Sequence, residues 1–565
     1  MNTSLQNIFV ARNTIAHSGR SRSWRCSLAL VLLAMLPLAT AQANVYVTDI
    51  KLNSGTNLVT TPVGSTVNIS YILNEAATAG ATIEILSGTN VVGAIAIVGG
   101  NPGTIRGTNT VAWSGKDAGG NNVTPGTYSI RITAAANGYA DWTQITSDAN
   151  PGNYVWAPRG IAVNNNTNSP FYGRVFVGNA RQGPNPTNSP GDKVGIQKLN
   201  ADGSPADEGV FSDGGYPWAG DFFSPWKMEV SADDKLYVSD WSGNGIVLAF
   251  DQVISPASLI TVLRQDNWPP VGTSDGTSTG VTNYANFSGP FVTGSGTNTQ
   301  VWMADISYDA NTNIMRSVGI RRWNVTTNGA IATNDLGKTM VQARGTADLN
   351  LFPFDVAVDK NGKIYTIQYR PTTNDTNFKV FRYPANPSGA TALTNAEWKV
   401  GGSNVYVGAY GIAVNPAATY VAVALREGTA LLVLNNPPIS VAPILSATTF
   451  TNGQFQFTLT GESNVTYVIQ ASTDLQTWIP VVTNTASDAT RSIIINAPDV
   501  QLFYRAIANP IVIDTGAGHD HRDAAWDNAG NLYDVDNFAS RWRAYSPPGP
   551  NQATTVAVPT VQVTP

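Results

Sequence analysis

The sequence predicts an all-β fold divided among several modules. The chain has 565 residues, which is more than one ordinary domain holds. Charged residues make up 13% and apolar residues 42% of the chain, a balance that argues against a disordered, highly charged polypeptide. The 52 Gly and 33 Pro, together with abundant Asn and Thr, favour short strands joined by tight turns over helices.

Residues 1–43 have the features of a bacterial secretory signal peptide. The segment contains four Arg but no Asp, Glu or Lys, and an apolar run from Leu28 to Leu38 follows the basic part. The run is too short to cross a bilayer, and the small residues at the end, Ala41 to Ala43, fit a signal peptidase site. We expect cleavage after Ala43, no stable membrane span after cleavage, and a secreted, periplasmic or cell-surface protein.

Cleavage would change the charge and the thiol content of the protein. Four of the 33 basic residues would leave with the segment, so 29 basic residues would face 38 acidic ones, and the net charge would change from −5 to −9. Such a surface repels phosphate backbones, so we expect no nucleic-acid partner. The single cysteine, Cys26, would also leave, which excludes disulfides, thiolate metal sites and cysteine nucleophiles.

Residues 44–140 predict a small β-sandwich, because short alternating strands are separated by Gly, Asn and Thr turns. Its end carries Trp113, then Gly-x-Asp-x-x-Gly over 115–120, then Pro-Gly-x-Tyr ending at Tyr128. This pattern resembles the immunoglobulin (Ig)-like domain of the flagellar hook-cap protein family. Such domains also occur as spacers in secreted bacterial proteins, and the resemblance implies that role here.

A phrase recurs at long intervals from about residue 150 onward, and recurrence of this kind predicts stacked β-units. Most copies continue into a hairpin and a second strand, as in Asp359–Tyr365. The six copies are 158–163, 225–230, 287–292, 353–358, 409–414 and 521–526. Their aligned third positions are Gly160, Lys227, Gly289, Asp355, Gly411 and Asp523, with steps of 67, 62, 66, 56 and 112 residues.

The repeated phrase resembles the blades of NHL and gluconolactonase-like β-propellers. In that family each blade reads Pro-x-Gly-Ile-Ala-Val, a turn with Gly, then Leu or Ile-Tyr-Val-x-Asp. The resemblance implies a six-bladed β-propeller with blades 1–5 in residues 150–440. Blade 6 and a closing strand would lie in residues 510–565, and we expect Thr554–Val558 to supply that closing strand to the first blade.

The long step before Asp523 indicates an inserted module at residues 442–508. The insert contains Gln-x-Ser-Thr-Asp-Leu-x-x-Trp over 470–478 and Phe-Tyr-Arg-Ala over 503–506. These residues are similar to a short fibronectin-like module that recurs near the C-termini of secreted bacterial proteins. Insertion into an exposed loop is tolerated because the entropy of loop closure grows only slowly with length. The predicted architecture is therefore a six-bladed β-propeller with two small β-sandwich modules.

The usual propeller site is the channel mouth where the innermost strands begin. Aligned repeats bring charged and aromatic side chains there, which could hold a sugar by ring stacking and hydrogen bonds. The alternative is that the charges pair with one another at a solvated rim. The candidate ligand-binding residues are Arg159, Trp226, Lys227, Phe354, Asp355, Tyr410, Arg522 and Asp523.

Two histidines are candidate metal ligands. His519 and His521 lie two residues apart, which places both on one side of an extended strand. Two imidazoles suit zinc or another transition metal, with Asp355 or Asp523 as a third ligand. The alternative is a pair of exposed loop histidines. A divalent metal is the one cofactor that the sequence suggests.

An aromatic cluster precedes the second repeat: Tyr216, Trp218, Phe222 and Phe223. If exposed, it would be a platform for glycan or peptide; if buried, it would seal two blades. No Gly-rich phosphate loop is found in the sequence.

Two functions follow from these observations. The first is a secreted, non-enzymatic binding or scaffold protein that recognises extracellular carbohydrate or protein surfaces through its propeller. The alternative is a metal-assisted hydrolase or lyase that acts on a sugar or lactone at the channel mouth. The sequence favours the first, because spacer modules that flank and interrupt a propeller are typical of surface recognition, whereas a fold alone assigns no reaction.

Overall fold

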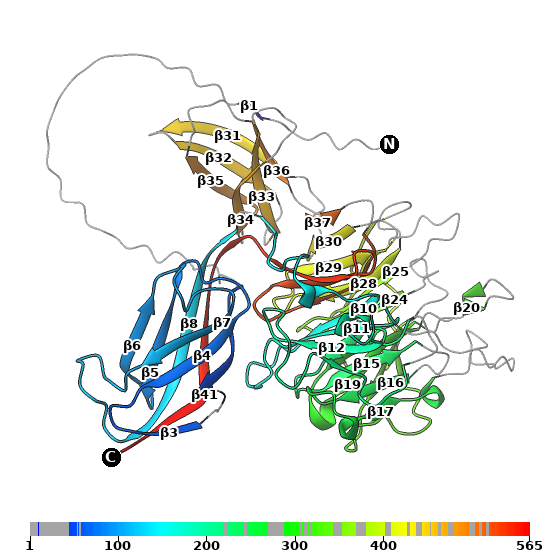
Figure 1. Ribbon diagram of the computed structural model, residues 1–565. Helices are drawn as coiled ribbons and strands as arrows, with labels where there is room; N and C mark the ends of the chain where they lie inside the picture. The colour runs from blue at the N-terminus through cyan, green and yellow to red at the C-terminus, as the bar shows by residue number, and fades with distance from the viewer. Residues whose placement is uncertain are drawn as a thin grey trace, which may run out of the picture. The chain divides into compact units, whose positions relative to one another are not determined.

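The computed structural model divides the chain into two compact units (Figure 1). One unit contains Ile439–Asn509 together with Met1–Gln42, and the other contains Ala43–Pro438 together with Pro510–Pro565. The structure describes residues 9–10, 44–53, 55, 58–139, 141–218, 223–241, 246–268, 288–305, 308–309, 314–315, 319–342, 353–368, 380–401, 408–426, 430–436, 443–451, 454–461, 465–472, 479–486, 488–496, 503–507, 511–515 and 519–565.

The predicted all-β class is confirmed. In the described part of the chain the regular elements are strands and five single 3₁₀ turns. Within those same residues, no helix has the length and apolar character needed to cross a membrane. The 3₁₀ turns are η1 (Pro151–Asn153), η2 (Pro190–Asp192), η3 (Pro256–Ser258), η4 (Gln265–Asn267) and η5 (Gly296–Asn298).

The first part of the larger unit has two sheets that enclose one apolar core. Trp113 and Tyr128 lie in that core with their rings 6.0 Å apart, and Trp113 Nε1 donates to the carbonyl of Lys116. One sheet has the order β2 (Val47–Leu52), β4 (Val67–Leu73), β7 (Gly107–Trp113). The other has the order β3 (Leu58–Pro62), β41 (Gly549–Thr564), β8 (Gly126–Tyr139), β5 (Gly80–Ser87), β6 (Asn90–Ile97).

The C-terminal strand does not close the first blade, which corrects the expectation for Thr554–Val558. β41 pairs antiparallel with β8 and parallel with β3, so it belongs to the N-terminal sheets (Figure 1). Val561 and Val563 on β41 are buried in the same core as Trp113. The alternating apolar residues of the tail therefore fill a gap between two strands of the N-terminal module, a long-range pairing that the local pattern could not reveal.

The rest of the larger unit contains six four-stranded antiparallel sheets. A short hairpin, β20 (Tyr308–Asp309) and β21 (Ile314–Met315), interrupts the third sheet. The first sheet has the order β10 (Pro158–Val163), β11 (Val175–Asn179), β12 (Gly195–Leu199), β13 (Phe211–Ser212), and the second has the order β14 (Met228–Val230), β15 (Leu236–Asp240), β16 (Ile246–Phe250), β17 (Ile260–Leu263). The third has the order β18 (Phe291–Thr293), β19 (Gln300–Asp305), β22 (Gly319–Asn324), β23 (Lys338–Val341), and the fourth has the order β24 (Pro353–Val358), β25 (Ile364–Gln368), β26 (Val380–Tyr383), β27 (Trp398–Val400). The fifth has the order β28 (Ala409–Val414), β29 (Tyr420–Leu425), β30 (Ala430–Asn435), β37 (Ile511–Thr515), and the sixth has the order β38 (His521–Trp526), β39 (Leu532–Asp536), β40 (Arg541–Ser546), β9 (Thr143–Gln144).

The first strands of the six sheets succeed one another in a closed cycle of contacts. β10 contacts β14, and the contacts continue through β18, β24, β28 and β38 back to β10. The sixth sheet takes its fourth strand from β9, which lies ahead of β10 in the sequence and pairs with β40. The sixth sheet, which meets the first, is thus completed by a segment that precedes the first sheet and not by the C-terminal tail.

The glycine of the repeated phrase is required by close packing between neighbouring first strands. A Cβ on Gly160 would lie 2.3 Å from the carbonyl oxygen of Trp226, and one on Gly411 would lie 2.8 Å from Cα of Asp523. No side chain fits at such distances, so the neighbouring backbone occupies the space that a side chain would need. This contact explains why Gly precedes Ile-Ala-Val in these two copies.

The smaller unit has two sheets around a separate core that includes Phe457, Tyr467 and Tyr504. One sheet has the order β31 (Ile444–Thr451), β32 (Gln454–Thr460), β35 (Thr490–Asn496). The other has the order β1 (Phe9–Val10), β36 (Phe503–Ile507), β33 (Val465–Ser472), β34 (Ile479–Ala486).

Substitution of Val561 by Ala tests whether the tail stabilises the N-terminal module. Val561 is fully buried, so loss of two methyl groups should lower the free energy of unfolding by about 2 kcal/mol. Urea unfolding measures this loss, and hydrogen exchange should accelerate over residues 126–139 of β8. The matched control is Val91→Ala on β6, where the side chain is 47% exposed and little should change. Equal effects of the two substitutions would contradict the pairing.

Candidate ligand-binding pocket

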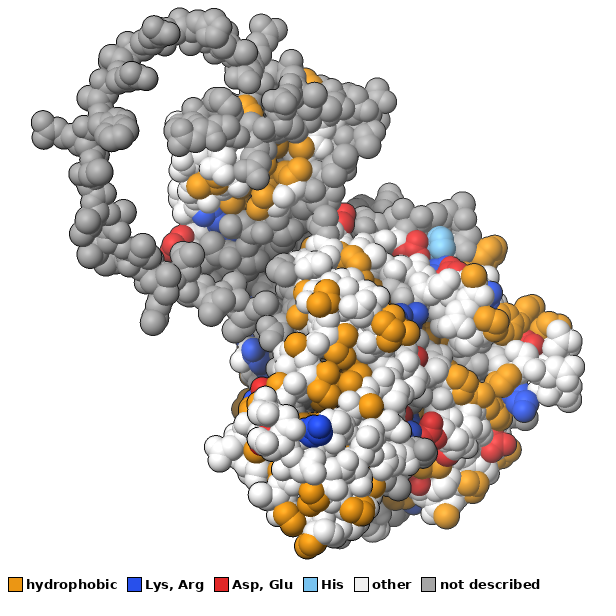
Figure 2. All heavy atoms as spheres, turned by 60° about the vertical axis from the view of Figure 1, so that its left-hand side comes forward, with side chains coloured by type: hydrophobic (Ala, Val, Ile, Leu, Met, Phe, Trp, Pro, Cys, Tyr) orange, Lys and Arg blue, Asp and Glu red, His pale blue; other side chains and the backbone are white. Residues whose placement is uncertain are grey.

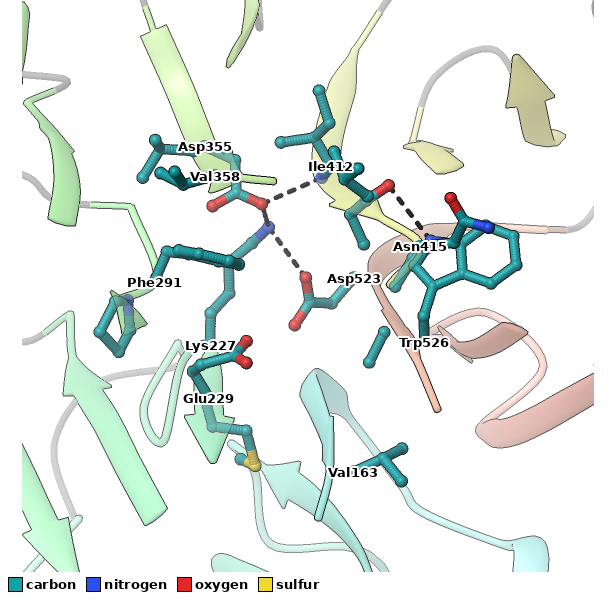
Figure 3. Close-up of a pocket in the computed structure, with 18 of the residues that line it drawn as sticks. Val163, Lys227, Glu229, Phe291, Asp355, Val358, Ile412, Asn415, Asp523 and Trp526 are labelled. Atoms are coloured by element: carbon teal, nitrogen blue, oxygen red, sulfur yellow. Dashed lines mark hydrogen bonds and ion pairs between the residues drawn. The ribbon is translucent and has the colours of Figure 1, made fainter. Parts of the chain in front are cut away.

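A buried ion-pair network lies where the six first strands meet. Lys227 Nζ donates to Asp355 Oδ2 at 2.5 Å, to Asp523 Oδ1 at 3.1 Å and to the carbonyl of Tyr410 at 2.6 Å (Figure 3). Lys227 directly precedes β14, whereas Asp355 is on β24 and Asp523 on β38. Each of the three charged side chains is at most 7% exposed, so the pairs act at low dielectric.

The same carboxylates also bind backbone amides of two further sheets. Asp355 Oδ2 accepts from the N–H of Ile412 at 3.0 Å, and Asp523 Oδ2 accepts from the N–H of Ile161 at 3.1 Å. Burial would by itself lower the pKa of Lys227, but the two carboxylates outweigh it and hold the pKa above its ordinary value. Burial raises the pKa of Asp355 and of Asp523, and the charge of Lys227 opposes that rise.

An aromatic layer covers one side of this network. Trp226, Phe354 and Tyr410 are each at most 5% exposed, and their ring centroids lie 4.5 to 6.3 Å apart. Trp241 joins the layer, 4.7 Å from Trp226. Rings at these separations and tilts pack as an apolar plug.

A cavity of about 280 Å³ lies on the other side of the network, toward the ends of the first strands (Figure 3). Lys227, Asp355 and Asp523 line its floor. All six sheets contribute to the wall, through Val163 and Asn165, Met228 and Glu229, Pro290 and Phe291, Val358 and Lys360, Val414 and Asn415, and Ala525 and Trp526. We call this cavity the axial pocket.

Glu229 is the carboxylic acid that projects into the axial pocket (Figure 3). Burial, reinforced by the negative charges of Asp523 and Asp355, raises the pKa of Glu229 to about 8. At neutral pH the side chain therefore carries its proton in most molecules. A protonated carboxyl group offers one O–H donor as well as acceptor lone pairs.

The structure corrects the predicted channel-mouth site. All eight predicted residues are buried, with side chains that fill the interior instead of forming an open rim. Three of them, Lys227, Asp355 and Asp523, line the axial pocket from its floor, and the other five do not line it. The alignment correctly grouped the three charged residues. The five predicted residues that do not line the pocket are Arg159, Trp226, Phe354, Tyr410 and Arg522.

The predicted aromatic platform is also wrong in its central residue. Trp218 is 4% exposed and packs in the core that contains Phe250, with its Nε1 donating to the carbonyl of Asp213. The hydroxyl of Tyr216 donates to Asp240 at 2.5 Å. Phe223 is 36% exposed, and Phe222 lies outside the described residues. Trp218 therefore seals the packing between neighbouring sheets, the alternative that the sequence left open.

The two histidines lie side by side at the start of the sixth sheet, with ring centroids 5.6 Å apart and planes 9° from parallel. The structure does not join them to Asp355 or Asp523, because those carboxylates bind Lys227. Their partners are instead Asp536 for His519 and Asp534 for His521. His521 is fully buried, which excludes the alternative of two exposed loop histidines.

Sequence reasoning missed Glu229 and the carboxylates around the histidines. Glu229 stands at the fifth position of the phrase, where four of the other five copies carry Ala, and that exception was the available signal. Asp534 and Asp536 alternate on the strand that follows the histidines, and an antiparallel hairpin brings Asp536 opposite His521. Asp514 had no such signal, because it belongs to the neighbouring sheet.

Neither a protein-family model nor a curated protein sequence matches the chain. Among solved structures, the chain is similar to the β-propeller domain of Cps50 (Swd1) from Myceliophteria thermophila, with a TM-score of 0.31 and 8% identity over 69% of this chain and 83% of that one. It is also similar to hydrazine synthase of Kuenenia stuttgartiensis, with a TM-score of 0.30 and 10% identity over 91% of this chain and 98% of that one. A third similar structure is a putative 6-phosphogluconolactonase from Bacteroides uniformis, with a TM-score of 0.26 and 9% identity over 74% of this chain and 100% of that one. Likenesses at these TM-scores carry no argument about activity.

Replacement of Lys227 by Met tests the ion-pair network. Removal of the cation leaves two buried carboxylates without compensation, which should cost about 3–5 kcal/mol of unfolding free energy. Urea unfolding at pH 7 measures the loss. Lys116→Met on the exposed surface is the control and should change little. Because the unpaired carboxylates cause the loss of stability, adding Asp355→Asn and Asp523→Asn to Lys227→Met should restore part of the unfolding free energy. A further loss of stability in the triple variant would contradict this explanation.

The raised pKa of Glu229 predicts a pH-dependent stability. A carboxyl group with a raised folded-state pKa contributes stability that is fully present below the unfolded value of 4.5 and is lost as pH rises through about 8. In urea unfolding from pH 5 to pH 9, wild type should therefore lose stability relative to Glu229→Gln. Parallel pH profiles for the two proteins would show that Glu229 titrates normally.

Proposed function

We propose that the protein is a secreted carbohydrate-binding protein built on a six-bladed β-propeller. The closed cycle of contacts among the first strands of six four-stranded sheets supports the propeller assignment. Residues 44–140 would be the Ig-like spacer and residues 442–508 the inserted fibronectin-like module. Two sheets around one core in each of these regions support that division.

The proposal of a cleaved signal peptide agrees with the position of Asn44. This residue, the first after the expected cleavage site, is 2% exposed. Its backbone carbonyl accepts hydrogen bonds from the side-chain amides of Asn74 and Asn531, and its own side chain donates to the carbonyl of Pro547. Asn44 is therefore part of the folded module, which supports cleavage before it.

The axial pocket is the ligand site that the geometry supports best. The observation that carries this assignment is a polar cavity on the axis to which all six sheets contribute. Near neutral pH Glu229 is a neutral hydrogen-bond donor, and Lys227, Asp355 and Asp523 bind one another. Phe291 and Trp526 add aromatic groups to the wall.

This chemistry fits a neutral sugar. Sugar hydroxyls both donate and accept, so they match a protonated carboxyl group and the Oδ1 atom of Asn165, which has no hydrogen-bond partner among the described residues. The apolar C–H face of a sugar packs on aromatic groups. A cavity of about 280 Å³ holds one small ligand, such as the terminal unit of a longer glycan.

A glycan array followed by calorimetry on the best neutral glycan tests this function. Glu229→Leu should weaken binding by at least tenfold, because it removes the donor and places an apolar group in the pocket. Phe223→Ala is the control, since its ring lies outside the pocket and tests the surface aromatic group instead. Wild-type binding should not respond to a chelator. Binding that survives Glu229→Leu but is lost in Phe223→Ala would move the site to the surface, and absence of any glycan binding would refute the proposal.

A further inference from the structure

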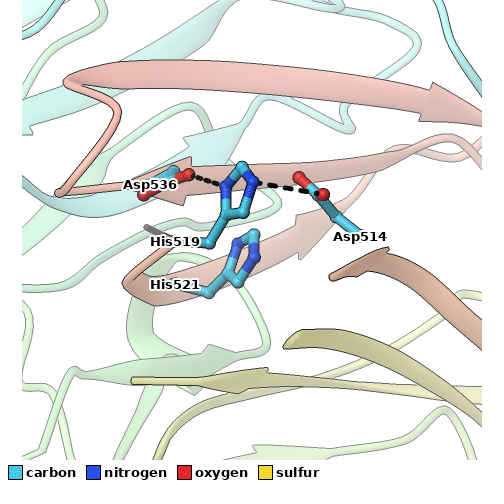
Figure 4. A group of neighbouring side chains, drawn as sticks. All are labelled: Asp514, His519, His521 and Asp536. Carbon is cyan, nitrogen blue, oxygen red and sulfur yellow. Dashed lines mark hydrogen bonds and ion pairs between the residues drawn. The ribbon is translucent and has the colours of Figure 1, made fainter. Parts of the chain in front are cut away.

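A second group of polar side chains lies away from the axial pocket, at the junction of the fifth and sixth sheets (Figure 4). Asp514 is on β37 of the fifth sheet, His521 begins β38 of the sixth sheet, and Asp536 ends β39. His519 precedes β38. One nitrogen or oxygen atom from each of these four residues lies within 4.8 Å of the others.

Both imidazoles are oriented by buried carboxylates. His519 Nδ1 lies 2.5 Å from Asp536 Oδ2, and His521 Nδ1 lies 2.7 Å from Asp534 Oδ2. An ionised carboxylate can only accept, so in both rings Nδ1 carries the proton and Nε2 of the neutral ring has a free lone pair. A carboxylate behind the Nδ1 of each histidine is the usual arrangement around histidine metal ligands.

Among the described residues, none makes a hydrogen bond to Nε2, the remaining nitrogen of His521, although His521 is fully buried. A buried imidazole nitrogen without a partner loses its interaction with water and gains nothing in return. A metal ion would supply that missing partner. This atom is the second indication of a ligand, independent of the clustering of the four residues.

Asp514 supplies an oxygen in the right place. Its Oδ1 lies 3.7 Å from Nε2 of His519, which is too long for a hydrogen bond. Two ligands about 2.0–2.1 Å from a tetrahedral zinc ion lie about 3.3–3.4 Å apart, so a small inward movement would suffice. The other oxygen of Asp514 is held by Arg543 at 3.0 Å and by the hydroxyl of Tyr545 at 3.2 Å, which fixes the carboxylate.

The charges around the group favour a cation. Asp148, Asp514, Asp534 and Asp536 carry four negative charges, and Arg543, which contacts three of them, carries one positive charge. Asp536 is already saturated, because Arg543 and three backbone N–H groups also donate to it. It therefore serves as the support of His519 while Asp514 remains the carboxylate ligand. The side chains of His519 and Asp514 are 23% and 20% exposed, so an ion can reach the group.

We propose that His519, His521 and Asp514 bind one divalent transition-metal ion, of which Zn²⁺ is the best match, and that this ion joins the fifth sheet to the sixth. Two imidazoles and one carboxylate are a donor set that zinc prefers, and the fourth position would be taken by water. The site differs from the one that the sequence suggested, since neither Asp355 nor Asp523 takes part. It does not depend on carbohydrate binding by the axial pocket.

The experiment uses the full-length mature protein, stripped of metal and titrated with Zn²⁺ by calorimetry. We expect one zinc per chain and a Tm that rises with free zinc concentration. Asp514→Asn should weaken binding at least tenfold and His519→Ala should abolish it. Asp534→Asn removes only the support of His521, so it should weaken binding by about 10–100-fold. Cobalt loading adds a spectroscopic readout, because the visible absorption of a tetrahedral Co²⁺ ion should be lost in the same variants.

Asp148→Asn is the matched control. It removes a negative charge that also pairs with Arg543 but offers no ligand, so zinc affinity should stay within about threefold of wild type. Failure of the wild-type protein to bind zinc would overturn the proposal, and so would equal affinities of wild type and Asp514→Asn. A uniform loss in Asp148→Asn and Asp514→Asn would show that general electrostatics attracts the ion and would also overturn the assigned ligands. Asp514 is partly exposed, so its substitution keeps the test valid where His519→Ala does not fold.

Discussion

The arrangement of the six sheets depends on one buried ammonium group. Lys227 of the second sheet binds carboxylates of the fourth and sixth sheets and a carbonyl of the fifth, and the carboxylates in turn hold amides of the fifth and first sheets. Gly289 at the start of the third sheet leaves room for the Lys227 stem, since a Cβ there would lie 2.3 Å from Cβ of Lys227. Five of the six sheets are thus bound to the network around Lys227 and the third packs against its stem, so the cost of burying the charge is offset when these sheets are in place.

The same network explains why the axial pocket lies where it does. The aromatic layer covers one side of the ion pairs, so the space that remains along the axis lies on the other side, beside Glu229. The low dielectric that strengthens the Lys227 pairs also disfavours a further negative charge, which keeps Glu229 protonated near neutral pH. Charged residues are also rare in the chain as a whole: they make up 13% of it, and charged side chains are few and scattered on the face shown in Figure 2.

The sequence predicted what depends on local repetition and missed what depends on long-range pairing. The recurring phrase located all six first strands, and its aligned third positions correctly grouped Lys227, Asp355 and Asp523. The alignment could not show that these charges neutralise one another, because their partners are separated by 128 and 296 residues. The same limit hid Asp514 beside His519 and the true partner of the C-terminal tail.

The insert interrupts the fifth sheet between its third strand, β30, and its fourth strand, β37, while the sixth sheet is completed by an exchange of strands between the chain ends. β9, which precedes the first sheet, completes the sixth sheet, and β41, which follows the sixth sheet, completes the N-terminal sheets. Asp523 of the sixth sheet accepts from the N–H of Ile161 in the first sheet, and Arg543 on β40 donates to Asp148 just beyond β9. The module occupies the connection between β30 and β37, which pair directly with each other, so it adds only the modest entropic cost of a longer loop. The fifth and sixth sheets meet where β37 is followed by β38. The His519–His521–Asp514 group lies at that same junction, directly after the insert, where a bound ion would hold β37 against β38.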